Sequence, residues 1–369
     1  MDARPFRRPV VSPAMDLVEL EQRARTLLAP TAYDYIAGGA DDERTLAENA
    51  AAWGRVRLRP RVLQDVALVD ASTTVLGTPV SLPVLVAPMA YHRLVHDEGE
   101  EATAAGTAAA GTVLVASTLA TTSLEDVAAA APGSPQWFQL YVHRDRGFTA
   151  ELVARAGEAG YRALVLTVDL PVLGYRPRDE RNRFTLPEGM VMANVGRSTE
   201  ATDGSAIALY AAGELDPSLT PADVGWLRGL TTLPVLVKGV LRADDARTCV
   251  DEGAAGIVVS NHGGRQLDSA VAGADALPEV VDAVAGRAEV LVDGGVRRGT
   301  DVVKALAMGA RAVLLGRPVL WALATGGADG VTALLGGMRE EVVRAMALCG
   351  CPTVADVGPD LLSFPPGRP

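Results

Sequence analysis

Short runs of Val, Leu and Ile recur along the chain, and longer amphipathic segments separate them. Eight such runs are apolar at nearly every position and do not alternate with polar residues; they cover residues 83–88, 112–117, 136–141, 163–169, 234–239, 256–264, 289–295 and 312–318. Continuous apolar runs are typical of strands that are covered on both faces, as in parallel sheets. The pattern therefore predicts a parallel sheet with helices packed around it.

The segments between these runs carry the start and stop signals of helices. Residues 98–111 begin with acidic residues and end on glycine, and residues 123–131 begin with a serine that precedes an aspartate by three positions. Both features favour a helix start, and a closing glycine favours its end. Residues 149–160, 242–253 and 298–310 likewise close on or beside a glycine. Eight strand–helix units predict an α/β fold, a (β/α)8 TIM barrel; a doubly wound sheet is the alternative.

One connection departs from the regular spacing. Residues 170–233 separate the fourth and fifth strands and include the polar, glycine-rich stretch NVGRSTEATDGS. Such a length is far above the usual connection, and loops after strands build the active site of such barrels. We therefore expect a partly mobile lid there, within a single domain over residues 1–369 that has an N-terminal helical extension and a flexible tail at residues 1–15.

Composition and charge restrict the partners. The net charge is −11 at pH 7, which argues against a nucleic-acid surface and an anionic membrane surface. The cysteines, Cys249, Cys349 and Cys351, have no zinc-site spacing, so we expect no metal and a reducing compartment. The N-terminus lacks the apolar core of a signal peptide, and the uncharged residues 102–124 fit a helix followed by a strand. We expect a cytoplasmic protein that binds any anionic substrate through a local cluster of Arg or Lys.

Polar or small residues directly follow almost every apolar run. In a barrel, the residues at the C-terminal ends of the strands face the catalytic mouth. Chance would place one or two polar residues there, whereas here they form nearly a full ring. The members are Ala87, Pro88, Met89, Ser117, Gln139, Tyr141, Thr167, Asp169, Lys238, Ser260, His262, Asp293, Gly316 and Arg317. The ring predicts a functional site at this end of the barrel.

Glycine and arginine residues follow the seventh and eighth strands. Gly294, Gly295 and Arg297 come after the seventh strand, and Gly316 and Arg317 come after the eighth. Barrels commonly bind a phosphate between these two loops. Glycine N–H groups can approach the anion closely, and arginine adds charge-assisted hydrogen bonds. The pair of motifs predicts a phosphate site.

A lysine ends the fifth strand, where its side chain should point into the mouth. A buried ammonium group needs an electron-rich partner. For Lys238, the partner is either the N1–C2=O edge of a flavin or the carboxylate of Asp293 in an ion pair.

The stretch SNHGGRQLD supplies a candidate base and a candidate anion clamp. His262 is one of four histidines, and an imidazole that titrates near neutrality suits a general base. Asp169 could orient His262 and stabilise its charged form. Arg265 and Arg176 could each bind a substrate carboxylate through two parallel hydrogen bonds.

Several longer stretches carry a family resemblance. They are YDYIAGGADDERTLAENAAAWGRVRLRPRVL, APMAYHRLVHDEGE, FQLYVHRDR, LTVDLPVLGYRPRDERNRF, SNHGGRQLD and DGGVRRGTDVVKALAMGARAVLLGRP. With them nearly the whole chain resembles the FMN-dependent L-2-hydroxy acid oxidase and dehydrogenase family, which includes glycolate oxidase, lactate oxidase and mandelate dehydrogenase. The resemblance implies FMN as cofactor, oxidation of an L-(S)-2-hydroxy acid to the 2-keto acid and a homotetramer. Because no haem domain or quinone-docking helix is evident, we expect O2 to be reduced to H2O2.

The resemblance also implies roles for individual residues. His262 would take a proton, Asp169 would support it, and Tyr141 would stabilise charge near the substrate hydroxyl. The substrate carboxylate would be bound by Tyr35, Arg176 and Arg265. The flavin ring and ribityl chain would be lined by Ala87, Pro88, Met89, Ala90, Ser117, Gln139, Thr167, Lys238 and Ser260. The ribityl and phosphate end would be held by Asp293, Gly294, Gly295, Arg297, Gly316 and Arg317.

One departure from the family bears on the substrate. Leu119 stands where glycolate oxidases have a tryptophan, and a smaller side chain leaves room for a larger substrate. Two segments, APMAYHRL and ASTLATTSLEDV, look most like those of actinobacterial 4-hydroxymandelate oxidases. We therefore expect (S)-mandelate or 4-hydroxymandelate as substrate.

Other functions remain open at this point. The first alternative is a glycolate or L-lactate oxidase or dehydrogenase of the same family. Another FMN barrel enzyme, such as a type 2 isopentenyl-diphosphate isomerase, would share the phosphate motif. It would not need the whole set of Tyr35, Tyr141, His262, Arg176 and Arg265. An inactive flavin-binding barrel would not need that set either.

Overall fold

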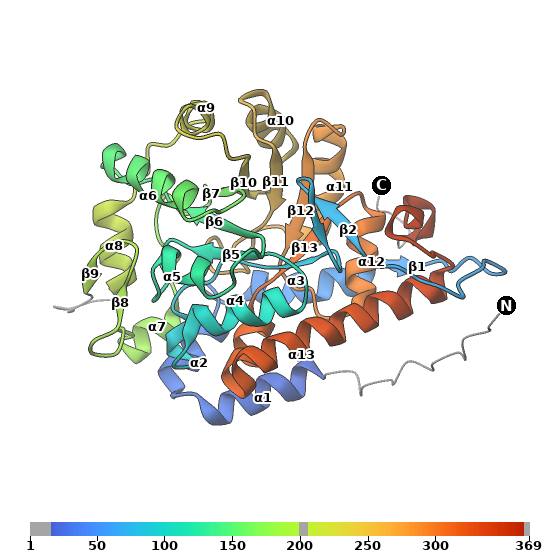
Figure 1. Ribbon diagram of the computed structural model, residues 1–369, viewed down its shortest axis with the longest axis horizontal. Helices are drawn as coiled ribbons and strands as arrows, with labels where there is room; N and C mark the ends of the chain where they lie inside the picture. Colours follow the sequence, from blue (N-terminus) through green and yellow to red (C-terminus); the bar gives the residue numbers. More distant parts are fainter. Residues whose placement is uncertain (1–15, 199–205, 365–369) are drawn as a thin grey trace.

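Eight parallel strands form a closed barrel at the centre of the protein (Figure 1). The computed structural model describes residues 16–198 and 206–364. In order around the barrel the strands are β4 (Val84–Val86), β5 (Leu114–Ser117), β6 (Gln136–Leu140), β7 (Leu164–Thr167), β10 (Val235–Val240), β11 (Gly256–Val259), β12 (Glu289–Asp293) and β13 (Ala312–Leu315). Spatial order follows chain order, and β13 pairs with β4. The predicted TIM barrel is confirmed, and the doubly wound sheet is excluded.

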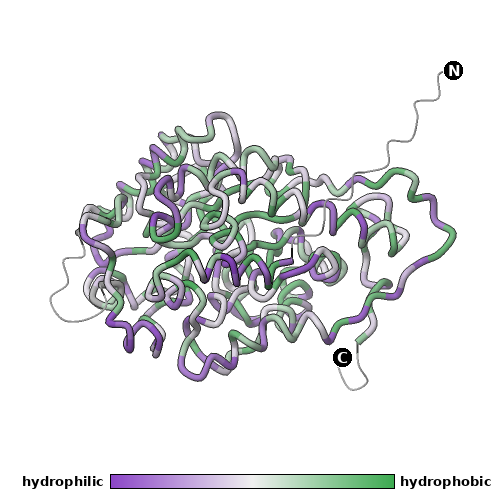
Figure 2. The backbone as a smooth tube through the Cα atoms, turned by 90° about the horizontal axis from the view of Figure 1, so that it is seen from below, coloured by the Kyte–Doolittle hydropathy of each residue, from purple (hydrophilic) through white to green (hydrophobic). Residues whose placement is uncertain are grey.

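Alternate residues of each strand are buried on opposite sides of the barrel wall. On β12, Leu291 belongs to a smaller apolar cluster, whereas Val290 and Val292 belong to the larger one. In a barrel of this size, one set fills the interior and the other packs against the helices. The hairpin of β2 (Thr73–Val75) and β3 (Thr78–Val80) contributes to the inner cluster and so covers one end of the barrel. Figure 2 shows hydrophobic chain segments in the interior and hydrophilic ones on the periphery.

Helices follow the strands as the capping signals predicted. The predicted ones are α4 (Gly99–Ala109), α5 (Leu124–Ala129), α6 (Arg146–Glu158), α10 (Ala243–Asp251) and α12 (Gly299–Ala307). A further helix, α11 (Gly273–Val284), was not predicted from such signals. The side chain of Ser123 caps α5 by accepting a hydrogen bond from the Asp126 N–H. α11 contains Pro278, a residue that normally argues against a helix interior.

The predicted N-terminal helical extension is present. It consists of α1 (Leu17–Leu27), α2 (Pro30–Ala37) and α3 (Arg44–Arg55), with α1 packed along α13 (Figure 1). β1 (Arg57–Leu58), which follows this extension, pairs antiparallel with β14 (Leu362–Ser363) near the end of the described chain. Short 3-10 helices occur at η1 (His92–Leu94), η2 (Val354–Asp356) and η3 (Pro359–Leu361). The proposed tail at residues 1–15 lies outside the described residues.

The last long helix is a core element. α13 (Arg317–Cys349) is kinked at Gly326 and Gly327, whose backbone angles are not helical. Length and composition alone would let this helix cross a membrane, but half of its most apolar window is buried inside the protein. It packs against α4, α1 and α12, as expected for a core helix. The expectation of no membrane span stays a prediction.

The long connection after β7 is folded where it is described. It contains α7 (Pro177–Asn182), β8 (Val191–Met192), β9 (Arg197–Ser198), α8 (Ala206–Glu214) and α9 (Ala222–Gly229). Phe184, Leu186, Met192 and Tyr210 are buried within it. Residues 199–205, most of the glycine-rich stretch, lie outside the described part. The segment is therefore a packed cap with its own elements, and its opening and closing stay a prediction.

Candidate active site

The C-terminal ends of the strands surround a pocket whose empty space, including open solvent at its mouth, is about 1120 Å³. Of the residues expected there, the pocket is lined by Tyr35, Ala87, Pro88, Met89, Ala90, Ser117, Leu119, Gln139, Tyr141, Thr167, Arg176, Lys238, His262, Arg265, Asp293, Gly294, Gly295, Arg297, Gly316 and Arg317. The other two, Asp169 and Ser260, lie behind His262 and Lys238 as their hydrogen-bond partners. The pocket is also lined by residues that were not assigned to the site from the sequence: Ile36, Leu170, Leu173, Gly263, Val296, Leu314, Leu315 and Leu320.

His262, which follows β11, is held by an aspartate that follows β7, and β10 lies between these two strands. Its Nδ1 lies 2.8 Å from Asp169 Oδ1, and its backbone N–H donates to Ser260 Oγ at 3.1 Å. His262 has a left-handed backbone with φ of 58°, and Gly263 and Gly264 follow at 65° and 75°. This tight turn is the one that the Gly-Gly pair predicted, and it aims the imidazole into the pocket. The bond at Nδ1 leaves Nε2 as the nitrogen available to a substrate.

Gly239 makes room for this pair. It has φ of 106° in a bulge of β10, and a Cβ there would lie 2.6 Å from Cβ and Cγ of Asp169. Any larger residue would push the carboxylate away from His262 or distort the bulge. From the sequence, Gly239 is only the end of a strand, because its close approach to Asp169 joins two segments that are far apart along the chain.

Burial and charge together set the protonation of the pair. Burial lowers the pKa of His262, and Asp169 offsets this only in part. Burial raises the pKa of Asp169, but His262 and Lys238 more than offset it, so that pKa lies below its usual range. At neutral pH the pair therefore consists of a neutral imidazole and a carboxylate, the form required of a general base.

The lowered pKa predicts the pH profile of substrate oxidation. Protonated His262 cannot accept a proton, so kcat/KM should fall as the pH drops through a pKa below the ordinary value of about 6.5. In Asp169→Asn, which loses the carboxylate that raises this pKa, the acid limb should move to still lower pH while the rate falls. Steady-state kinetics across about pH 4 to 9 measure the acid limb in the wild type and in Asp169→Asn. An acid limb above about 6.5, or an upward shift in Asp169→Asn, would contradict the assignment.

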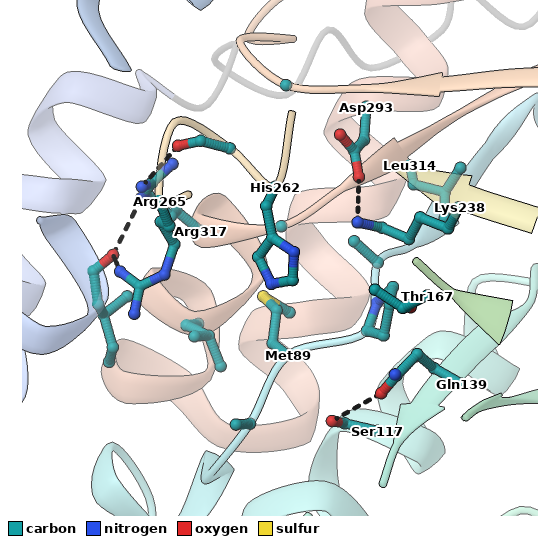
Figure 3. A pocket seen from close by; sticks show the side chains of 18 of the residues that line it. Met89, Ser117, Gln139, Thr167, Lys238, His262, Arg265, Asp293, Leu314 and Arg317 are labelled. Atoms are coloured by element: carbon teal, nitrogen blue, oxygen red, sulfur yellow. Dashed lines mark hydrogen bonds and ion pairs between the residues drawn. The ribbon is translucent and has the colours of Figure 1, made fainter. Parts of the chain in front are cut away.

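Lys238 has protein partners and still has a donor to spare. Its Nζ lies 3.3 Å from Asp293 Oδ2 (Figure 3). The same Nζ donates to Ser260 Oγ at 2.9 Å. Burial lowers the pKa of Lys238, but Asp293 and Asp169 raise it more, so the amine is held protonated. The ion pair considered as an alternative is therefore present. Because an ammonium group has three N–H donors, the ion pair does not exclude a contact with a bound flavin.

Four arginines line the same pocket without an acidic partner. In the described part of the chain, no carboxylate oxygen lies within 4.0 Å of the guanidinium nitrogens of Arg176, Arg265, Arg297 or Arg317. Burial, with repulsion from neighbouring arginines, lowers the pKa of Arg176 to about 10 and that of Arg317 to about 9. Unpaired buried cations are costly unless an anion joins them. The pocket is thus built for anions, despite the net charge of −11.

Two of these arginines also fasten the N-terminal extension to the barrel. Arg265 donates to the carbonyls of Tyr35 at 2.6 Å and Gly38 at 3.0 Å, and its guanidinium lies 4.9 Å from the Tyr35 ring centroid. Arg317 donates to the carbonyl of Ile36 at 2.9 Å. Cations favour the C-terminal carbonyls of a helix, here α2. These hydrogen bonds hold the end of α2 at the mouth of the barrel. The strand pattern alone did not predict this position of α2.

The cap supplies the other support of α2. Phe184 stacks on Tyr35 with 4.3 Å between ring centroids and 8° between planes. Arg178 of α7 pairs with Glu43 at 2.6 Å, and Asn182 donates to Asp34 at 2.8 Å. Burial raises the pKa of Tyr35, which keeps its hydroxyl a hydrogen-bond donor. Tyr35 is therefore positioned by the barrel on one side and the cap on the other.

The pocket fits the FMN expected from the resemblance. Two buried polar atoms of lining residues, Gln139 Nε2 and Thr167 Oγ1, have no hydrogen-bond partner within the described structure. A polar ring edge would satisfy both atoms. Open space also lies beside Arg317, because a Cβ placed on Gly316 would meet its nearest atom, Met89 Sδ, only at 3.7 Å. The residues therefore suit a ligand with a polar ring at one end and an anion at the other.

The glycines after β12 have a second structural role, which could not be predicted from the sequence. Gly294 and Gly295 have φ of 91° and 77°. A Cβ on Gly295 would collide with the backbone of Asn49 in α3. The glycines therefore let α3 approach the phosphate end, in addition to any contact with an anion.

Comparisons with known proteins agree with this geometry. The family described as FMN-dependent dehydrogenase matches residues 24–364. An L-lactate oxidase of Nostoc sp. is 53% identical over 360 residues, which cover 95% of this chain and 99% of that protein. The glycolate oxidase of Spinacia oleracea is 49% identical over 344 residues, 92% of this chain and 93% of the other.

Solved structures give the same result. A mandelate oxidase with (S)-4-hydroxymandelic acid has a TM-score of 0.91 at 47% identity, covering 95% of this chain and 98% of that one. A mandelate oxidase with benzoyl-formic acid has a TM-score of 0.86 at 46% identity, covering 95% and 98%. None of these relatives supports the isomerase alternative. With its closed barrel, its base and its anion pocket, this chain belongs to the FMN-dependent dehydrogenase family, as an FMN-dependent 2-hydroxy acid oxidase.

Proposed function

We propose that this enzyme oxidises an (S)-2-hydroxy acid with an aryl side chain, mandelate or 4-hydroxymandelate, to the 2-keto acid. The observation that carries the reaction is that the His262–Asp169 pair shares one pocket with the unpaired Arg176 and Arg265. A base beside two free cations suits a substrate that carries both a carboxylate and a proton to be removed. Each turnover removes two electrons and two protons from the substrate, and O2 takes both to become H2O2.

The chain's own residues bind the substrate and move a proton. Arg265 and Arg176 would hold the carboxylate, with Tyr35 as a hydroxyl donor, and would orient the α-carbon. His262 Nε2 would accept one proton, and Asp169 would stabilise the resulting imidazolium. Tyr141 lines the pocket, and burial, followed by the charge of Asp169, raises the pKa of its hydroxyl. Tyr141 would therefore donate a hydrogen bond to the reacting oxygen.

FMN, when bound, supplies the two-electron acceptor between substrate and O2. Its ring and ribityl chain would be held by Ala87, Pro88, Met89, Ala90, Ser117, Gln139, Thr167, Lys238 and Ser260. Its phosphate end would be held by Asp293, Gly294, Gly295, Arg297, Gly316 and Arg317. The spare donor of Lys238 and the free Gln139 amide suit the polar edge of the ring.

The aryl preference is supported by an apolar wall. Met89, Leu119, Leu170 and Leu173 line the pocket. None of these side chains offers a strong hydrogen bond to a small polar substrate, whereas burying an aromatic ring against them contributes roughly 1.5–3 kcal/mol. Related mandelate oxidases have been solved with (S)-4-hydroxymandelic acid and benzoyl-formic acid. The lactate oxidase relative keeps a small alkyl acid as the second candidate.

Anaerobic bleaching of the flavin tests the substrate. The panel is glycolate, L-lactate, both mandelate enantiomers and 4-hydroxymandelate, mixed with the purified yellow enzyme. We expect (S)-mandelate or (S)-4-hydroxymandelate to bleach fastest and (R)-mandelate to bleach slowly, because inversion moves the α-hydrogen away from its reacting position. Fastest bleaching by glycolate or lactate would overturn the aryl proposal, and a colourless protein would overturn the flavin proposal.

Three further expectations stay predictions. Use of O2 as the acceptor is supported by the oxidase relatives. A cytoplasmic location is supported by three free, buried cysteines. A homotetramer is supported by the resemblance to the family.

A further inference from the structure

Outside the pocket, one buried carboxylate connects two loops of the barrel mouth. Glu100, in the first turn of α4, is 2% exposed, and no Lys or Arg of the described chain lies within 4.0 Å of it. Its Oε1 accepts from the backbone N–H groups of His92 at 3.1 Å and Thr121 at 2.8 Å. Its Oε2 accepts from the hydroxyls of Thr121 at 2.6 Å and Thr122 at 3.0 Å. Four donors and the helix N-terminus satisfy this carboxylate without a cation.

The two loops that Glu100 joins form part of the substrate wall. The loop after β4 carries Met89, and the loop after β5 carries Leu119, both of which line the pocket. Two other hydrogen bonds join these loops directly in the described chain: the Tyr91 N–H donates to the Leu119 carbonyl at 3.4 Å, and the Arg93 N–H donates to the Thr121 hydroxyl at 3.2 Å. Both are longer than the normal hydrogen-bond distance or close to its upper limit. Glu100, which accepts four hydrogen bonds from the two loops, therefore contributes to the relative position of Met89 and Leu119.

The first of these loops is strained where it passes Glu100. Tyr91 has a left-handed backbone with φ of 61°, which is unusual for a bulky side chain. Such a conformation is unfavourable and persists only where its surroundings hold it. The next residue, His92, forms two hydrogen bonds with α4. Its backbone N–H donates to Glu100, and its Nδ1 is hydrogen-bonded to Thr103 Oγ1 at 2.8 Å. The first turns of α4 thus hold the strained loop in place.

We propose that Glu100 is a positioning residue for substrate specificity. It keeps the loops after β4 and β5 in register, so that Met89 and Leu119 stand at the spacing that accepts an aryl ring. The inference rests on the proposed oxidation of an aryl hydroxy acid at this pocket. Small hydroxy acids depend mainly on the arginines and His262, which Glu100 does not contact, so they should respond less.

Three variants separate positioning from general stability. Glu100→Met keeps the length of the side chain and removes every acceptor. Glu100→Gln keeps one oxygen for the two fixed backbone N–H groups, and the threonine hydroxyls can turn to accept from its amide. Glu101→Gln is the matched control, because Glu101 is the next residue, its side chain is 43% exposed, and it pairs loosely with Arg93 at 3.6 Å.

The readout is the selectivity between aryl and alkyl ligands in the purified holoenzymes. Dissociation constants of benzoylformate and pyruvate are measured from flavin absorbance, without turnover, and kcat/KM is measured for (S)-mandelate and L-lactate. In Glu100→Met we expect aryl binding to weaken about tenfold or more relative to alkyl binding, with FMN retained. Glu100→Gln should stay within about threefold of the wild type, and Glu101→Gln should not change.

Equal weakening of both ligands, or no change in either, overturns the positioning role. If Glu100→Met does not fold, Thr122→Val provides the test, since it removes one hydroxyl donor to Glu100 and keeps the carboxylate. We expect the same direction of shift with a smaller size, and unchanged selectivity would overturn the proposal. If the wild-type enzyme prefers the alkyl acids, the proposed aryl function is wrong. The change in the aryl-to-alkyl selectivity ratio between wild type and variant still tests the role of Glu100 in that case.

Discussion

Replacing His262 with asparagine should lower the rate of flavin reduction by substrate about 10²- to 10⁴-fold, while the protein keeps its FMN. Among the described residues that line the pocket, His262 is the only histidine, and its Nδ1 lies 2.8 Å from the Asp169 carboxylate, which orients the ring. Asparagine suits the test because it tolerates the left-handed backbone of this position, where φ is 58°. Stopped-flow absorbance under anaerobic conditions measures the reductive step directly.

His262→Ala serves as the comparison variant. Alanine also removes the base, but it tolerates the left-handed turn less well, so any extra loss in Ala over Asn reports backbone strain. Equal flavin content in the two variants would show that the cofactor site is intact. Reduction at the wild-type rate in His262→Asn would refute the role of His262 as the base.

Arg265→Lys should raise KM for the hydroxy acid on the order of 10- to 100-fold, because hydrogen bonds to charged groups each contribute about 1.5–3 kcal/mol. The planar guanidinium can present two parallel N–H groups to a carboxylate while it also donates to the Tyr35 and Gly38 carbonyls. An ammonium group is a point charge and cannot keep both sets of bonds. The structure therefore makes this substitution more damaging than a simple change of cation.

The KM effect has its own control. Arg181→Lys, on the exposed side of α7, makes the same chemical change away from the pocket and should leave KM unchanged. The midpoint of thermal unfolding shows whether Arg265→Lys also lowers stability, because Arg265 donates hydrogen bonds to carbonyls at the end of α2. A KM within about twofold of the wild type in Arg265→Lys would contradict a carboxylate role for this arginine.

The strand ends were predictable because they depend on local rules. Apolar runs mark buried strands, and chain order alone places their ends at one mouth. That is why His262, Lys238 and Arg317 could be assigned to a common site. The glycines after His262 could likewise be assigned to a turn, since positive φ is a local property.

Contacts between distant segments were not predictable in this way. Gly239 is needed because Asp169, on another strand, approaches it within 2.6 Å of a Cβ position. Gly295 is needed because α3 passes beside it. The stacking of Phe184 on Tyr35 joins the cap to the N-terminal extension, and no periodic pattern connects those two segments.

The amino-acid sequence by itself determined the barrel, the chemical nature of the mouth and the resemblance to the FMN-dependent family. These follow from hydrophobic periodicity and from short motifs, whose information lies within a few neighbouring residues. Among residues 16–198 and 206–364, the tertiary structure alone decided which charged groups lack an opposite charge: four pocket arginines have no carboxylate, and the Glu100 carboxylate has no Lys or Arg. Partnership depends on which side chains packing brings within a few ångströms, and packing joins residues that the sequence keeps far apart.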